Sequence, residues 1–397
     1  MKTVDSVDFK GKRALVRVDF NVPLNEKFEV SDDTRIRAAL PTLNKILGDG
    51  GSLVLMSHLG RPKGTISDKY SLKHIVSVLA ALLQRDVKFV NDCISAEAFA
   101  VAGALKPGEV LLLENLRFYP EEEKGDDDFS RKLSRLSDVY VNDAFGTAHR
   151  AHASTTVVAK FFPGNACFGK LMASEVSSLE KVLRSPQKPV TAIIGGAKVS
   201  DKINVLVSLL NVCNHVIIGG GMAFTFIKAS KGRIGNSLCE DDQLETALRI
   251  FHMARSNDIM IHIPVDVIAS SAFSNDAERV TCKSDEIPDG FMGLDIGPET
   301  IKLFTDVVQK SKTIVWNGPM GVFEMSNFEN GTKSVAFALR DATKKGTFTL
   351  VGGGDSVAAI NKYKLAAEVS YVSTGGGAML EYIENGSLVG VDAIKNS

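Results

Sequence analysis

Short, continuously apolar runs alternate with segments of helical pattern along almost the whole chain. In the first half, strands are expected near residues 12–18, 52–57, 87–90, 110–114 and 138–142. In the second half, they are expected near residues 190–195, 215–219, 259–262, 312–316, 347–351 and 369–372. Strands without polar alternation are buried on both faces, as in parallel sheets covered by helices. The pattern therefore predicts an α/β protein.

The length of 397 residues exceeds what one hydrophobic core usually organises, so two domains are expected. Helical patterns are found near residues 34–47, 71–84, 95–104, 127–136 and 172–184. Breaks at 161–165 and 185–189 flank the last of these. We predict two doubly wound parallel-sheet (Rossmann-like) domains joined by a hinge: an N-terminal domain over 1–170, a hinge helix and linker over 171–189, and a C-terminal domain over 190–380. In such sheets ligands bind at the carboxyl ends of the strands.

Three glycine-rich turns at 195–196, 352–354 and 375–377 each follow an apolar run and precede a segment of helical pattern. Backbone N–H groups at a helix N-terminus stabilise anions. Lys198 and Lys202 are four residues apart, which predicts one shared helix face, and Asp355 follows the second turn. Together these features indicate a site for a polyphosphate and its metal. A solvated lysine pair beside turns that are merely tight remains the alternative.

Further turns of close approach are expected at 219–221 and 293–298. Residues 316–324 end another strand with an apolar lip and one carboxylate, Glu324. Glu324 is predicted either to accept hydrogen bonds from ribose hydroxyls or to start the next helix.

Polar side chains follow four strands of the first half and are expected to share one rim of a parallel sheet. They are Asp19 and Asn21, His58 and Arg61, Arg117, and Arg150, with Arg35 at the start of the first helix. Several arginines together suit a small polyanion, because the guanidinium fork matches carboxylate and phosphate. The alternative for each arginine is a solvated or ion-paired surface position. The acidic run 121–128 is expected to be a solvated loop and helix start.

Composition excludes several classes of function. The 46 Lys and Arg residues against 47 Asp and Glu residues give a net charge of −1, which predicts neither nucleic acid nor an anionic membrane as partner. The five scattered cysteines fit a reduced, cytoplasmic compartment, and no apolar run reaches the length of about 18 residues that a membrane span needs. Residues 164–171 fit a phosphate-loop pattern except for Leu171, where Ser or Thr would hold magnesium, so this match is rejected.

Seven segments, in order and from end to end, resemble the phosphoglycerate kinase family: 14–23, 57–62, 143–154, 195–202, 316–324, 352–356 and 373–378. The resemblance implies Mg²⁺-dependent phosphoryl transfer between ATP and the carboxylate of 3-phosphoglycerate in glycolysis, giving 1,3-bisphosphoglycerate and ADP. It also implies domains that close about a hinge and a last segment, 381–397, that packs on the first domain. Three positions depart from the family pattern: Ser356 replaces Thr, Tyr371 replaces His and Met379 replaces Ser.

The resemblance also implies the site residues. The three-carbon acid would be held by Asp19, Phe20, Asn21, Arg35, His58, Leu59, Gly60, Arg61, Arg117 and Arg150. The nucleotide would be held by Gly196, Ala197, Lys198, Lys202, Gly220, Gly293, Asn317, Pro319, Glu324, Gly353, Gly354, Asp355 and Ser356. From the charge neutralisation that phosphoryl transfer needs, we predict that Arg35, Lys198, Gly376 and Gly377 are catalytic and that Asp355 holds Mg²⁺.

The acceptor carboxylate is ionised at neutral pH, so this reaction requires no general base. Two alternatives remain open from the sequence. A nicotinamide oxidoreductase also has doubly wound sheets with glycine turns, although no G-x-G-x-x-G motif opens either half. A non-catalytic scaffold that kept the fold is the other, because fold alone does not establish function. Balanced charge and short loops favour a monomer.

Overall fold

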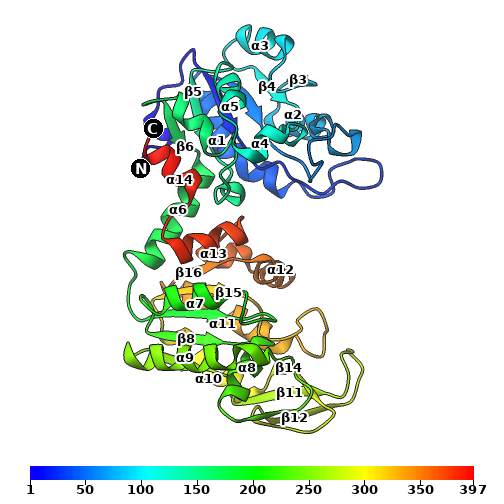
Figure 1. The fold of residues 1–397 in the computed structure, drawn as a ribbon, viewed down its shortest axis with the longest axis vertical. Coiled ribbons are helices and arrows are strands. Elements are labelled where there is room, and N and C mark those ends of the chain that lie inside the picture. Colours follow the sequence, from blue (N-terminus) through cyan, green and yellow to red (C-terminus); the bar gives the residue numbers. More distant parts are fainter. The chain divides into compact units, whose positions relative to one another are not determined.

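The computed structural model describes residues 1–397 and divides into two compact units. Unit 1 comprises Met1–Ser177 and Ser387–Ser397, and unit 2 comprises Ser178–Gly386 (Figure 1). The C-terminal helix α14 (Val389–Lys395) belongs to unit 1, where it contacts β6 (Ala166–Phe168). The division falls inside helix α6 (Lys170–Leu183). None of the helices is both long and apolar enough to cross a membrane.

A six-stranded sheet organises unit 1, and every pairing in it is parallel. Its order is β3-β4-β2-β1-β5-β6, with bounds β1 Arg13–Arg17, β2 Ser52–Met56, β3 Val87–Val90, β4 Val110–Leu113 and β5 Val139–Asn142. The five expected strands are confirmed, and the short edge strand β6 was not predicted. From β1 the chain first builds toward β3 and then returns to add β5 and β6. The reversal point lies between β1 and β5, where such sheets bind ligands.

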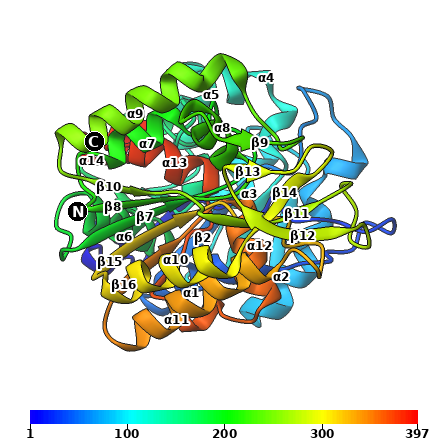
Figure 2. The same ribbon diagram turned by 90° about the horizontal axis from the view of Figure 1, so that it is seen from below.

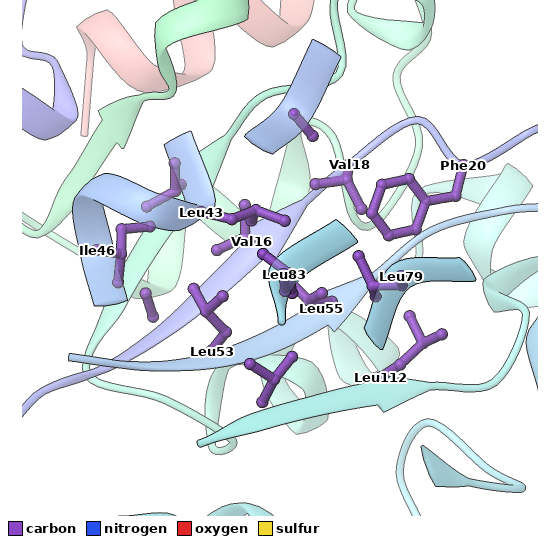
Figure 3. Packing of buried hydrophobic residues seen from close by; sticks show 14 of the residues in the cluster. Val16, Val18, Phe20, Leu43, Ile46, Leu53, Leu55, Leu79, Leu83 and Leu112 are labelled. Carbon is purple, nitrogen blue, oxygen red and sulfur yellow. The ribbon is translucent and has the colours of Figure 1, made fainter. Parts of the chain in front are cut away.

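Helices α1 (Thr34–Gly48) and α2 (Val76–Leu83) cover one face of this sheet. Leu43 and Ile46 of α1 point toward Val16 and Leu53 on the strands, and Leu79 of α2 packs in the same cluster (Figure 3). Burying each such side chain contributes roughly 1.5–3 kcal/mol. Besides α14 and the first part of α6, this unit contains the helices α3 (Ala96–Gly103), α4 (Pro120–Lys124) and α5 (Asp127–Ser134).

Unit 2 contains a second six-stranded parallel sheet, ordered β10-β8-β7-β15-β16-β17. Its strands are β7 Val190–Ile194, β8 His215–Ile218, β10 Met260–His262, β15 Thr313–Asn317, β16 Phe348–Val351 and β17 Tyr371–Val372. All six were expected from the sequence. The reversal point lies between β7 and β15, in the centre of the sheet.

Helices cover both faces of this second sheet. Helices α7 (Ile203–Leu209), α8 (Met222–Ala229) and α9 (Leu244–Ser256) lie on one face, and α10 (Pro298–Lys310) and α11 (Asn330–Lys344) lie on the other (Figure 2). Helices α12 (Gly354–Lys362) and α13 (Gly376–Asn385) each follow a glycine turn directly, as predicted.

Two small sheets in unit 2 escaped the sequence analysis. Strands β11 (Asp266–Ser270), β12 (Arg279–Lys283) and β14 (Met292–Ile296) form an antiparallel sheet, and β9 (Arg233–Ile234) pairs with β13 (Glu286–Ile287). The turn expected at 293–298 is therefore wrong in part, because Gly293 lies within β14. Strand β12 alternates between exposed and half-buried residues, a pattern unlike the buried runs of the parallel strands.

Two local predictions are wrong. Helix α7 begins only at Ile203, so Lys198 precedes the helix, Lys202 is its N-cap, and the two lysines share no helix face. The acidic run forms α4 and the start of α5, and Glu122 within it is fully buried rather than solvated. Tertiary contacts explain both cases, because the loop and the carboxylate have hydrogen-bonding partners that are distant in sequence.

Candidate active site

Loops at the carboxyl ends of β1, β2 and β4 are joined by hydrogen bonds in unit 1. The amide of Gly60 donates to Asn21 Oδ1 at 2.8 Å, and Arg117 Nη1 donates to the carbonyl of Gly60 at 2.8 Å. Gly60 has φ of +62°, and a Cβ there would lie 2.4 Å from the ring of Tyr70. Glycine is therefore required at this position.

Four arginines, three of them predicted, act on a buried histidine. Arg17 Nη2 lies 3.2 Å from His58 Nδ1. A guanidinium can only donate, so Nδ1 accepts and the imidazole is neutral with its proton on Nε2. Burial lowers the pKa of His58 well below 6.5, and the charges of four guanidinium groups lower this pKa further: Arg17, Arg117, Arg35 and Arg150. Positive charge is therefore concentrated at this edge of the sheet.

The buried guanidinium of Arg117 has an N–H group that an anion could accept a hydrogen bond from. Its side chain is 4% exposed, and burial lowers its pKa to about 10. Arg117 Nε lies 3.3 Å from Glu123 Oε1, but no protein acceptor completes a hydrogen bond with this buried N–H. A buried donor without an acceptor is costly, and an anionic ligand would satisfy it. A solvated surface position is therefore wrong for this arginine.

The other predicted residues of this set differ in exposure and pairing. Arg35, at the start of α1, forms an ion pair with Asp19, and its side chain is 43% exposed. Arg150 Nε donates to His149 Nε2 at 3.3 Å. Arg61 is exposed and has no ion-pair partner, whereas Phe20 and Leu59 are buried.

Sequence reasoning did not select Arg17 as a site residue. Arg17 ends β1, is fully buried, and contacts His58 directly. The available signal was an arginine within the otherwise apolar strand 14–18, a position where an unpaired charge is too costly to bury.

In unit 2, the glycine-containing turns that follow β7, β8 and β15 lie against one another. They comprise residues 195–196, 219–221 and 318–321. A Cβ on Gly195 would lie 2.1 Å from the carbonyl oxygen of Pro319, and one on Gly220 would lie 2.6 Å from the nitrogen of Gly196. These turns pack backbone against backbone at the reversal point of the sheet. A side chain at either glycine would collide with the backbone of the neighbouring turn and force the turns apart.

The turns after β16 and β17 continue the same rim. Asn317 Nδ2 donates to the carbonyl of Gly352 at 2.8 Å, and Lys202 Nζ donates to Asn317 Oδ1 at 2.5 Å. A Cβ on Gly376 would lie 2.9 Å from Gly353 Cα. Lys202 and the two helix N-termini that begin near Gly353 and Gly376 are therefore adjacent, as the sequence predicted.

A pocket of 430 Å³ opens beside these turns. The predicted nucleotide residues in its wall are Gly196, Ala197, Gly220, Gly293, Pro319, Glu324 and Asp355. Val322, from the predicted apolar lip, also lines the pocket, and apolar side chains that sequence reasoning missed complete the wall: Phe224, Leu238, Pro264, Phe273 and Met292. No pattern marks these residues as one group, because they come from separate segments of the chain. An apolar wall of this kind can bind a flat, largely apolar ring of a ligand.

Six predicted nucleotide residues do not line this pocket: Lys198, Lys202, Asn317, Gly353, Gly354 and Ser356. Lys198 is exposed and has no ion-pair partner. Gly354 is also exposed, in the first turn of α12. Ser356 is fully buried, and its Oγ accepts a hydrogen bond from the amide of Gly318 at 2.6 Å, so it joins two loops.

Asp355 fits the predicted magnesium contact. It is exposed in the first turn of α12 and lies in the pocket wall. No group of three or more His, Cys, Asp or Glu side chains forms a metal cluster anywhere in the chain. A single carboxylate is sufficient for Mg²⁺, which usually binds one or two carboxylates together with substrate phosphates and water.

Comparison with known proteins gives one consistent result. Residues 4–386 match the sequence model described as phosphoglycerate kinase. The phosphoglycerate kinase of Porphyromonas gingivalis is 51% identical over 99% of this chain and 100% of its own length, and the cytosolic phosphoglycerate kinase 3 of Arabidopsis thaliana is 50% identical over 99% and 97%.

Solved structures agree with these relatives. Phosphoglycerate kinase from Coxiella burnetii superposes with a TM-score of 0.92 at 37% identity, covering 99% of this chain and 98% of the other. The enzyme from Pyrococcus horikoshii superposes with a TM-score of 0.82 at 31% identity, covering 100% and 98%. From its sequence, its paired parallel sheets and these matches, the chain belongs to the phosphoglycerate kinase family.

Proposed function

We propose specific residue roles for the phosphoglycerate kinase reaction of this chain, which is reversible phosphoryl transfer between ATP and the carboxylate of 3-phosphoglycerate in glycolysis. The acid binds at the arginines of unit 1, and the nucleotide binds at the glycine turns of unit 2. The observation that carries the first assignment is the group of four guanidinium groups around His58, which stays neutral. Binding of a nucleotide in unit 2 would leave this group of cations in unit 1 without a role.

In unit 1, we assign the acid to Asp19, Phe20, Asn21, Arg35, His58, Leu59, Gly60, Arg61, Arg117 and Arg150. Arg117 supports this assignment most directly, because its buried Nε–H completes no hydrogen bond in the protein, although Nε lies 3.3 Å from Glu123 Oε1. The neutral imidazole of His58 donates from Nε2, since Nδ1 accepts from Arg17. A neutral imidazole can donate a hydrogen bond to an anion without placing a further positive charge among the arginines.

In unit 2, the apolar part of the pocket takes the nucleotide base. Glu324 accepts hydrogen bonds from ribose hydroxyls, and Lys202 faces the phosphates beside Asn317. Asp355 holds Mg²⁺, which neutralises phosphate oxygens when it is bound. The N-terminus of α12 directs backbone N–H groups toward the same phosphates.

The transfer itself needs positioning and charge neutralisation rather than covalent catalysis. Arg35 and Lys198 flank the transferred group, and the amides of Gly376 and Gly377 stabilise the acid. No base is needed, because the acceptor carboxylate is already ionised. Since we assign the two substrates to different units, domain closure is the step that would bring them together and exclude water.

We also propose that the protein is monomeric and cytoplasmic. The first proposal rests on the balanced charge of −1, and the second on the reduced cysteines and the cytosolic plant relative. Analytical ultracentrifugation checks the first, and fractionation of the source cells checks the second.

Acyl-hydroxamate formation tests the proposed roles. Purified protein is mixed with 3-phosphoglycerate, Mg-ATP and hydroxylamine, and product is measured against each omitted component. Arg35→Ala is expected to reduce turnover far more than nucleotide affinity. Arg37→Ala on the same helix, with a side chain 60% exposed, is the matched control. Equal losses of turnover and nucleotide affinity would contradict the role of Arg35. Absence of product from folded, ATP-binding parent protein would support the scaffold alternative.

A further inference from the structure

A fully buried carboxylate lies behind the arginines of unit 1. Glu122, on helix α4, accepts hydrogen bonds from the Ser154 amide at 2.9 Å and from Ser154 Oγ at 2.6 Å. Both bonds are donated to the carboxylate, one to each oxygen. A buried charge is retained only when hydrogen bonds and an opposite charge offset its desolvation. The acid site described above does not use this group.

Ser154 connects that carboxylate to the arginines. Its single hydroxyl proton is donated to Glu122, so the Ser154 oxygen is free to accept from Arg17 Nε at 3.1 Å. Arg17 in turn donates through Nη1 to the carbonyl of Val18 at 2.6 Å and through Nη2 to His58 at 3.2 Å. All three donating nitrogens of the guanidinium thus have fixed partners. A continuous chain runs from carboxylate to hydroxyl to guanidinium to imidazole.

The same helix also fixes the loop that carries Arg150. The backbone carbonyl of Glu122 accepts from the Ala153 amide at 2.9 Å, and Tyr140 Oη donates to the Ser154 carbonyl at 2.7 Å. Thr155 Oγ1 closes the loop by donating to the carbonyl of Arg150 at 2.8 Å. Release of Ser154 would therefore loosen both the Arg17 side chain and the start of this loop.

We propose that Glu122 is a positioning residue for the acid site, acting through Ser154 to fix Arg17, His58 and the loop at 150–154. The inference rests on the assignment of these arginines to 3-phosphoglycerate. Glu122 makes no contact with the substrate, because it is enclosed behind Ser154. Its effect is on the affinity for the acid and not on the nucleotide.

Glu122→Gln tests the inference with little change in volume. The glutamine amide nitrogen cannot accept, so one of the two Ser154 donors loses its acceptor. The KM for 3-phosphoglycerate is expected to rise on the order of tenfold, as with other residues that orient ligand-binding groups. The KM for Mg-ATP is expected to change less than twofold. Glu121→Gln is the matched control, because it removes the same charge from an exposed position on the same helix.

Ser154→Ala provides a second, independent variant if Glu122→Gln does not fold. It removes only the hydroxyl between Glu122 and Arg17, and the same selective rise in the KM for 3-phosphoglycerate is expected. An unchanged KM for the acid in a folded variant would overturn the inference, as would parallel rises in both KM values. Failure of the parent enzyme to use 3-phosphoglycerate would instead refute the proposed function.

Discussion

Replacing Asp295 with asparagine should change how the stability of unit 2 depends on pH. Asp295 lies in β14 and is 4% exposed. Its Oδ2 accepts from the Gly331 amide at the start of α11 at 2.7 Å, and its Oδ1 accepts from the Ile296 amide at 2.9 Å. Burial raises its pKa from 3.8 to about 7, although both hydrogen bonds oppose this change. The folded state therefore binds a proton that the unfolded state has already released.

The magnitude follows from this pKa difference. At about 1.4 kcal/mol per pKa unit, a rise from 3.8 to about 7 corresponds to about 4 kcal/mol. Because the folded pKa is the higher one, this stability is fully present below about pH 4 and is lost as the pH rises through about 7. Asparagine does not titrate, so Asp295→Asn removes the dependence. The asparagine side chain has one acceptor oxygen fewer, so one backbone amide loses its partner. This loss lowers the free energy of unfolding of the variant by about 1–3 kcal/mol at every pH.

Urea unfolding from pH 4 to pH 8 measures the difference between parent and variant. Trp316 is the only tryptophan in the chain and is fully buried in β15, so its fluorescence reports on the unit that contains Asp295. Relative to the parent, the variant should gain up to about 4 kcal/mol between these pH values. Curves for the two proteins that stay parallel within about 1 kcal/mol would refute the assignment of a raised pKa to Asp295.

Two further substitutions test the nucleotide side. Gly353→Ala should unfold at lower urea concentration than Gly346→Ala: both have positive φ, +96° and +92°, but only the first adds a Cβ 2.2 Å from Asn317 Nδ2. Equal midpoints would show that this contact relaxes without cost. Glu240→Gln should raise the KM for Mg-ATP severalfold, because Glu240 accepts from the amide and hydroxyl of Ser200 and so holds the loop that contains Lys198. An unchanged KM would remove that loop from the nucleotide site.

Local sequence patterns determined the sheets and placed most of the proposed site residues at strand ends. Runs such as 52–57 and 312–316 are apolar on both faces, which only a sheet covered by helices can bury. Polar residues and glycines directly after such runs lie at the carboxyl ends of strands. Because parallel strands have their carboxyl ends at the same edge of the sheet, parallel pairing alone places these residues at that edge. This is why the sequence alone groups Asn21, Arg117, Asn317 and the glycine turns at strand ends.

Tertiary structure alone decided which polar groups are buried and how they are paired. Glu122 belongs to an acidic run that indicates solvent, yet Ser154, 32 residues away, supplies its hydrogen bonds. Arg17 interrupts an apolar strand, and nothing in the local sequence shows that His58 and Ser154 accept its hydrogen bonds. The apolar pocket wall comes from separate segments, including a small antiparallel sheet. Periodicity reports the solvent exposure of one element, whereas hydrogen bonding of buried charge depends on partners that only the folded chain brings together.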